Sequence, residues 1–209
     1  MESIRIGRKA STLALLLAAA PLTGAPAAAL SPVTTFTRGA VKVTETRTPA
    51  RRLDLEVVVP ATVEQVWTAF TTADGLVTWL GPSAKVRMEL GGEWEVSFGA
   101  GAPAGGNVLS WLPMEMLSVH AMAPEWFPTV RRDRTIAVFR FEPVGERQTR
   151  VRLAQIGWKD GEEWDKAFEY LGKGNAELLN MLHHRFAEGP TDWKAMMAKP
   201  ADKGEKKEK

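Results

Sequence analysis

The sequence contains no cysteine among its 209 residues. This absence excludes disulfide bonds, iron–sulfur clusters, thiol nucleophiles and a cysteine-linked lipid anchor. Histidine is scarce as well, and His120, His183 and His184 do not offer the i, i+4 spacing that brings two imidazoles together on a helix. We therefore expect no metal site and no cofactor, and a fold that is held together by apolar burial.

The chain also lacks a strong excess of either charge, since 27 lysine and arginine residues stand against 25 acidic ones. Lysines gather at the C-terminus, where residues 199–209 hold five of them against three acidic residues. This segment has neither arginine nor aromatic residues, the types that grip phosphates and stack on bases. We expect no nucleic-acid binding, and we interpret residues 191–209 as a lysine-rich disordered tail.

An apolar run near the N-terminus, Thr12–Leu22, has about half the roughly 20 residues that a membrane-spanning helix needs. Basic residues precede it, and Ala27-Ala28-Ala29 follows as a small-x-small cleavage pattern. We therefore predict a cleaved signal peptide over residues 1–29 and a secreted or periplasmic protein. No stable membrane insertion is expected after cleavage. An uncleaved N-terminal anchor is the alternative.

Residues 30–50 are rich in threonine and alanine and include two prolines. We interpret them as a linker or N-terminal extension, in which the alternation around Val41 and Val43 allows an edge strand. We place the start of the folded domain after this segment, and expect that domain to cover residues 51–190.

The pattern of a strand followed by a short amphipathic helix is the most informative part of the sequence. Apolar residues alternate over residues 51–60, which predicts a strand. Thr62 then stands at an N-cap position, with Gln65 as its capping-box partner. Two short helices are predicted, over residues 62–72 and 74–80. The first carries its large apolar side chains on one face: Val63, Val66, Trp67 and Phe70.

A series of alternating segments with turn signals between them follows these helices. A glycine-rich loop is expected at residues 99–106 and an aromatic-rich loop at residues 125–132. Runs of hairpins at this spacing are typical of an antiparallel meander, which together with the first strand makes a sheet of seven or a similar number of strands. The predicted strands of the meander cover residues 85–90, 93–98, 108–112, 116–122, 135–142 and 150–156.

A long amphipathic helix closes the domain and ends before Gly189-Pro190. Gly172 and Gly174 interrupt it, although each glycine costs about 1 kcal/mol relative to alanine in a helix interior. They either thin the helix where it covers a cavity or allow close backbone packing against the sheet. The apolar face of this helix comprises Trp164, Phe168, Leu171, Leu178, Leu182 and Phe186.

The order of these elements predicts an α+β helix-grip fold, a curved antiparallel sheet wrapped on a long C-terminal helix with two short helices after the first strand. The chain resembles the START-like superfamily, and within it the group similar to the C-terminal domain of the heat-shock ATPase activator homologue. This resemblance covers roughly residues 50–187. It is carried by Val59-Pro60-Ala61, Val66-Trp67, Phe70, Trp79, Gly91-Gly92-Glu93-Trp94, Pro113 to Leu117, Arg150 to Leu153 and Gly157-Trp158.

The resemblance implies an internal pocket, and the aromatic residues are the candidates for its wall. The chaperone partner of the eukaryotic activators is not carried over, because the export signal departs from a cytosolic role. Arg131, Arg132 and Arg134 either place positive charge at the pocket mouth or form a solvated basic loop. The predicted ligand-binding residues are Trp79, Trp94, Phe98, Trp111, Trp126, Phe127, Phe139, Phe141, Phe168, Leu171, Asn175 and Leu178.

Three functions are compatible with the sequence. The first is an exported protein that binds a small apolar or amphipathic molecule in an internal cavity. The second is a protein-interaction module with a filled cavity and a protein partner, as in an activator or co-chaperone. The third is a cavity enzyme of the cyclase or hydrolase type, which lacks support because the sequence offers no nucleophile motif and no acid–base pair. No catalytic residue is therefore assigned.

Overall fold

The computed structural model describes residues 33–48, 50–99 and 103–198. The signal peptide expected at residues 1–29 and residues 199–209 of the expected tail lie outside these ranges. Within them, no helix combines the length and the apolar character needed to cross a membrane.

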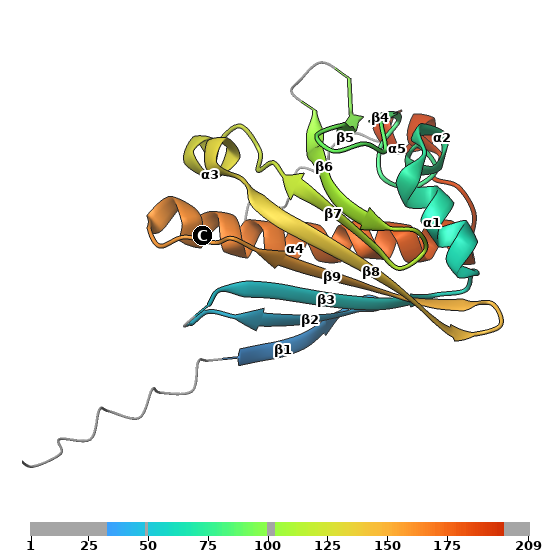
Figure 1. Ribbon diagram of the computed structural model, residues 1–209, viewed down its shortest axis with the longest axis horizontal. Helices are drawn as coiled ribbons and strands as arrows, with labels where there is room; N and C mark the ends of the chain where they lie inside the picture. The colour runs from blue at the N-terminus through green and yellow to red at the C-terminus, as the bar shows by residue number, and fades with distance from the viewer. Residues whose placement is uncertain (1–32, 49, 100–102, 199–209) are drawn as a thin grey trace, which may run out of the picture. The chain divides into compact units, whose positions relative to one another are not determined.

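In the described part of the chain, nine strands form one antiparallel sheet in the order β1-β2-β3-β9-β8-β7-β6-β5-β4. The pairing of β3 with β9 joins the first predicted strand to the last one and thereby connects the two ends of the domain. Figure 1 shows the sheet with the N-terminal strands at one edge. The strands are β1 Val33–Arg38, β2 Val41–Thr46, β3 Arg52–Val59, β4 Ser83–Val86, β5 Glu93–Ser97, β6 Ala104–Leu112, β7 Met116–Ala121, β8 Thr135–Gly145 and β9 Gln148–Ile156.

Alternating side chains divide the sheet into an inner and an outer face. In β3 the apolar residues Leu53, Leu55, Val57 and Val59 are all buried. The register shifts between Val108 and Ser110 in β6 and again between Pro143 and Gly145 in β8. Such irregularities bend a strand and increase its twist, so they help to curve the sheet around the helix that it holds.

Two short helices follow β3, as predicted: α1 Val63–Thr71 and α2 Ala73–Leu76. The capping box is confirmed, because the backbone N–H of Gln65 donates to Thr62 Oγ1 and Gln65 Oε1 accepts from the Thr62 N–H at 3.0 Å. The α1 face places Phe70, which is fully buried, against the rings of Trp79, Phe139 and Phe141. This end of the interior is therefore filled with aromatic side chains.

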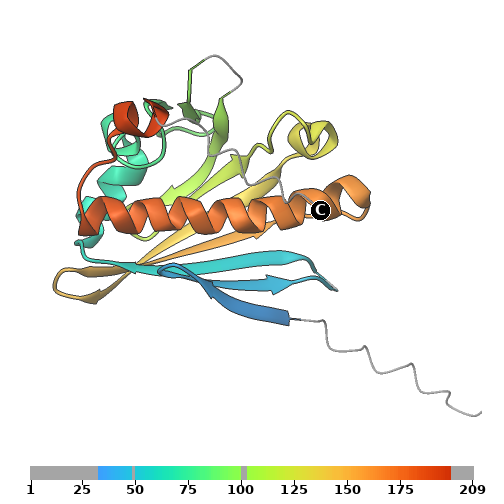
Figure 2. The same cartoon turned by 180° about the vertical axis from the view of Figure 1, so that it is seen from behind.

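The long helix α4 Glu162–Ala187 crosses one face of the sheet (Figures 1 and 2) and packs on β2 and β3. Trp164, Phe168 and Leu182 of its predicted face are buried, whereas Leu171, Leu178 and Phe186 are half-buried. The helix-grip fold expected from the sequence is thus the fold of the domain.

Two strands occupy the segment that we interpreted as a linker or extension. β1 and β2 add to the sheet beside β3, and the side chains of Val41 and Val43 in β2 are fully buried. The alternation around these valines therefore marked an inner strand rather than an edge. All six residues of β1 are exposed, so its sequence has no alternation of apolar and polar residues from which a strand could be predicted.

Two short helices were not expected. α3 Pro128–Asp133 forms inside the predicted aromatic loop, with Pro128 at its first turn, where its missing N–H costs nothing. α5 Trp193–Ala198 forms in the part of the chain that we assigned to a disordered tail. It is anchored by Trp193, whose indole N–H donates to the Val77 carbonyl at 2.5 Å and whose ring meets Phe98 edge-on.

Candidate functional site

A cavity of about 520 Å³ lies between α4 and the inner face of the sheet. Strands β5 to β9, the segment between β7 and α3, and one side of α4 form its wall. Most of the wall is apolar. The volume of the cavity falls within the range of roughly 300–1,000 Å³ that small-molecule sites occupy.

The cavity exists because small residues stand where the strands and α4 face each other. Ala104, Ala121 and Ala137 project only methyl groups from three neighbouring strands, and each of them lines the cavity. Gly105 lines it as well, at a φ of +113° that L residues rarely adopt, and a Cβ there would collide with the Trp94 carbonyl oxygen. Larger side chains at the three alanines would reduce this space, whereas a side chain at Gly105 would collide with the backbone of β5.

The two glycines of α4 have different surroundings, so both interpretations of them hold, one at each site. A Cβ at Gly172 would lie 3.3 Å from Glu45 Oε1 and 3.5 Å from Leu53 Cδ2, so this glycine allows close packing on the sheet. A Cβ at Gly174 would meet nothing within 4 Å, and Gly174 lines the cavity. The helix is therefore thinned at Gly174, where it covers the hollow.

Some of the residues predicted to bind a ligand stand on the cavity wall, and others do not. Trp94 and Phe139 form the inner part of the wall, and both are buried. The indole N–H of Trp94 donates to the Phe70 carbonyl at 2.7 Å, so its polar group is satisfied within the protein. The predicted residues that line the cavity are Trp94, Phe98, Trp126, Phe139, Leu171, Asn175 and Leu178.

The remaining predicted residues serve the core instead. Trp79 and Phe141 are buried around Phe70 under α1, and Phe168 is buried under the Arg47 and Arg51 guanidinium groups. Phe127 belongs to a small separate cluster beneath α3, and the half-buried Trp111 packs against the main core. None of these five side chains lines the cavity.

A buried polar chain also reaches the cavity wall; Asn175 was predicted for this wall, whereas Gln155 and Thr135 were not. Gln155 is 2% exposed, and its Nε2 donates to Thr135 Oγ1 at 2.7 Å while its Oε1 accepts from Asn175 Nδ2 at 2.6 Å. Gln155 and Asn175 both line the cavity. The signal was present, because Gln155 shares the inward parity of Val151 and Leu153 in β9.

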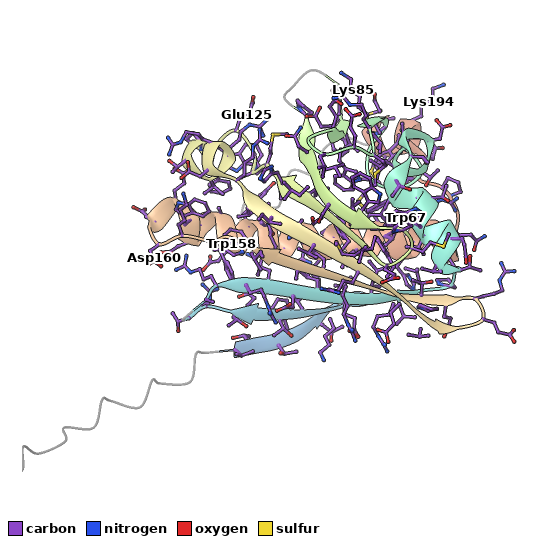
Figure 3. The ribbon with its side chains drawn as sticks, in the orientation of Figure 1. Trp67, Lys85, Glu125, Trp158, Asp160 and Lys194 are labelled. Atoms are coloured by element: carbon purple, nitrogen blue, oxygen red, sulfur yellow. The ribbon has the colours of Figure 1, made fainter. Side chains whose placement is uncertain are left out.

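Exposed aromatic side chains surround the opening of the cavity. Trp126 is 65% exposed, Phe98 56% and Tyr170 44%, and all three line the cavity. The rings of Trp126 and Tyr170 meet edge-on at 5.7 Å between centroids. Glu125, labelled in Figure 3, lies in the same exposed stretch before α3. The opening therefore presents apolar rings to solvent, which is unusual unless something contacts them.

α3 is fastened to α4 on one side of this opening. Glu163 Oε1 accepts from the backbone N–H groups of Thr129 at 2.6 Å and Val130 at 3.0 Å. Although desolvation acts to raise the pKa of Glu163, the hydrogen bonds from Val130 and Thr129 outweigh it and lower that pKa. Since α3 has no N-cap hydrogen bond of its own, this carboxylate serves as its cap.

His120 is the titratable imidazole of the wall. Burial lowers the pKa of His120 below its ordinary value, and the positive charge of Arg134 lowers it further. The imidazole is therefore neutral at neutral pH, so it offers one hydrogen-bond donor and one acceptor rather than a charge. Across the residues that the structure describes, no group of three or more His, Cys, Asp or Glu side chains is arranged to hold a metal ion.

A curved antiparallel sheet that holds a hollow against one long helix defines the class of helix-grip cup proteins. The sequence matches the family model described as "Activator of Hsp90 ATPase homolog 1-like protein" over residues 60–187, which is more than half of the chain. The chain therefore belongs to this family, within the START-like superfamily. A comparison with curated protein sequences gave no match.

Solved structures support the same fold. The Aha1 dimer from Colwellia psychrerythraea aligns with a TM-score of 0.54 at 21% identity, over 66% of this chain and 97% of that chain. Protein MLL2253 from Mesorhizobium loti aligns with a TM-score of 0.54 at 20% identity, over 64% and 95%. DynU16, a protein of the dynemicin biosynthetic locus, gives a TM-score of 0.55 at 19% identity, over 68% and 49%.

Proposed function

We propose that this protein binds a small apolar or amphipathic molecule in the cavity under α4. The observation that carries the proposal is the combination of an apolar hollow of about 520 Å³ with Gly174, where the covering helix leaves the space open. Affinity comes from burial of the ligand's apolar surface, and the amides of Gln155 and Asn175 set its orientation.

The proposal includes export. The basic residues, apolar run and alanine motif within residues 1–29 are the features of a cleaved signal peptide, so the binding domain acts in the periplasm or outside the cell. Determining the N-terminal residue of the protein recovered from each cell fraction tests this part. A mature chain that begins near residue 30 in the exported fraction supports it, and an intact Met1 in the cytoplasm contradicts it.

Titration with the neutral fluorophore N-phenyl-1-naphthylamine tests the binding function. We expect saturable fluorescence enhancement at one site. Gly174→Leu fills the open space from α4 and should weaken the probe affinity by about tenfold, or about 1.4 kcal/mol. Lys173→Leu adds the same side chain at the neighbouring exposed position, which does not line the cavity, and should bind the probe as the native protein does.

The second candidate function is a protein-interaction module. Its support is the family description, which names an activator of the Hsp90 ATPase, together with the fold shared with a solved Aha1 dimer. In this case the exposed rings of Trp126 and Phe98 would contact a protein rather than surround a ligand entrance. Two results together would favour this candidate: the native protein does not bind the neutral probe, and it binds a specific protein partner only when Trp126 is present.

A further inference from the structure

Three arginines lie in and just after the last turn of α3, and their environments differ. Arg132 is 72% exposed and donates to Asp133 Oδ1 at 2.8 Å. Arg134 donates to Asn107 Oδ1 at 2.7 Å. Arg131, by contrast, lines the cavity. The basic segment is therefore not uniformly a solvated loop, because one of its guanidinium groups belongs to the wall of the hollow.

Backbone carbonyl groups hold the Arg131 guanidinium in place. Its Nη1 donates to the Ala123 carbonyl at 2.6 Å, and its Nη2 reaches the Pro103 carbonyl at 3.4 Å. Both acceptors belong to residues of the cavity wall. A guanidinium has five N–H donors, so this anchoring fixes the group and leaves donors on it for a further acceptor.

The positive charge of Arg131 has no acidic partner among the residues that the structure describes, since no described carboxylate oxygen lies within 4.0 Å of it. Neutral carbonyl groups orient a guanidinium but do not neutralise it. The half-buried Arg131 guanidinium beside a mostly apolar cavity can therefore pair with an anionic group of the ligand.

The neighbouring groups that the structure describes add no negative charge that pairs with Arg131. Burial, and after it the positive charge of Arg134, lowers the pKa of His120, so the imidazole of this wall residue is neutral. Arg134 takes a φ of +62° and a ψ of 155°, a backbone region that is populated almost entirely by glycine. Glu125 also lines the opening, but it is exposed and water screens its charge.

We propose that the ligand is an amphiphile with a carboxylate head group, which pairs with Arg131 while its hydrocarbon part lies along Ala137, Phe139 and Leu178. This proposal rests on the proposed binding function and adds the ligand's charge to it. A carboxylate has two oxygens that match the fork of a guanidinium, and such charge-assisted pairs are stronger than neutral hydrogen bonds.

Displacement of bound N-phenyl-1-naphthylamine by dodecanoic acid and by dodecanol provides the test, because the two competitors differ only in their head group. The native protein should bind the acid about tenfold more tightly than the alcohol, and added salt should weaken only the acid. Arg131→Met should bring the two affinities together while the neutral probe still binds. Arg132→Gln, at the exposed arginine paired with Asp133, should keep the preference for the acid.

Each outcome decides the proposal. Equal binding of acid and alcohol by the native protein, or a preference that survives in Arg131→Met, overturns it while the binding function stands. If Arg131→Met no longer binds the probe, Arg131→Lys decides instead, because it keeps the charge: a retained preference supports the proposal and equal binding overturns it. If the native protein binds neither the probe nor either competitor, the binding function itself fails.

Discussion

At the scale of single residues, Gly172 and Gly174 have different roles on the same helix: Gly172 allows close packing on the sheet, and Gly174 leaves the cavity open. Alanine is favoured over glycine inside a helix by about 1 kcal/mol. Gly174→Ala should realise most of this gain in the free energy of unfolding, because its new methyl group enters open space. Gly172→Ala should gain less, since its methyl group presses on Glu45 and Leu53. Urea denaturation of both variants measures the difference, and an equal or larger gain at Gly172 would contradict this assignment.

His120 makes stability depend on pH. Its pKa in the folded protein lies below the ordinary value of 6.5, so the unfolded chain binds more protons as the pH falls through that value. The free energy of unfolding should therefore decrease between about pH 7 and pH 5 more steeply in the native protein than in His120→Gln. His183 and His184 are present in both chains, so the difference isolates His120. If urea denaturation gives the same pH dependence of the free energy of unfolding for both proteins, His120 does not contribute to it.

At the scale of elements, Glu163 joins α4 to α3. The pKa of Glu163 in the folded protein is lowered from an ordinary 4.5. The ionised carboxylate therefore stabilises the fold above pH 4.5, and this contribution is lost as the pH falls through the pKa of the folded protein. Glu163→Gln should therefore lower the melting temperature at neutral pH, and the difference from the native protein should shrink toward pH 3. A difference that does not depend on pH would mean that the charge of Glu163 has no part in holding α3. Glu162→Gln, one residue earlier, is the control for contact with α3, because the Glu162 carboxylate pairs with Lys166 of the same helix.

The elements that the sequence predicted well are those with strong periodicity. β3, α1 and α4 follow from alternation or from one-faced helices, and α1 also from its capping box. α3 was missed because Val130 is its one buried apolar residue and its cap comes from Glu163, which lies far away in the sequence. β1 was missed because neither of its faces is covered.

The candidate site was only partly predictable for a related reason. Phe139 and Phe141 share the inner face of β8, yet Phe139 lines the cavity whereas Phe141 is covered by Trp67 and Phe70 of α1. Alternation gives the face on which a side chain lies, but the element that covers it depends on tertiary packing. Gln155 shows the opposite case. The alternation in β9 places it on the inner face, but its polar side chain was not recognised as part of the cavity wall.

At the scale of the whole domain, the fold begins before residue 51. Val41 and Val43 are fully buried, and each such side chain contributes about 1.5–3 kcal/mol. A chain that starts at residue 51 should therefore lose about 3–6 kcal/mol, a large part of the 5–15 kcal/mol that stabilises a typical domain. A chain that starts at residue 33 keeps both strands and is the control. Equal stability of the two chains in urea denaturation would show that β1 and β2 are dispensable.

We infer that the cavity under α4, unlike the aromatic-filled end of the interior beneath α1, holds a small molecule in the native protein. Native mass spectrometry of the protein purified from the cells that make it tests this most directly. We predict a bound small molecule on the native chain and on Lys173→Leu, and a sharply reduced amount on Gly174→Leu. A bare chain mass in all three proteins, together with a failure to take up added apolar probe, would contradict the account.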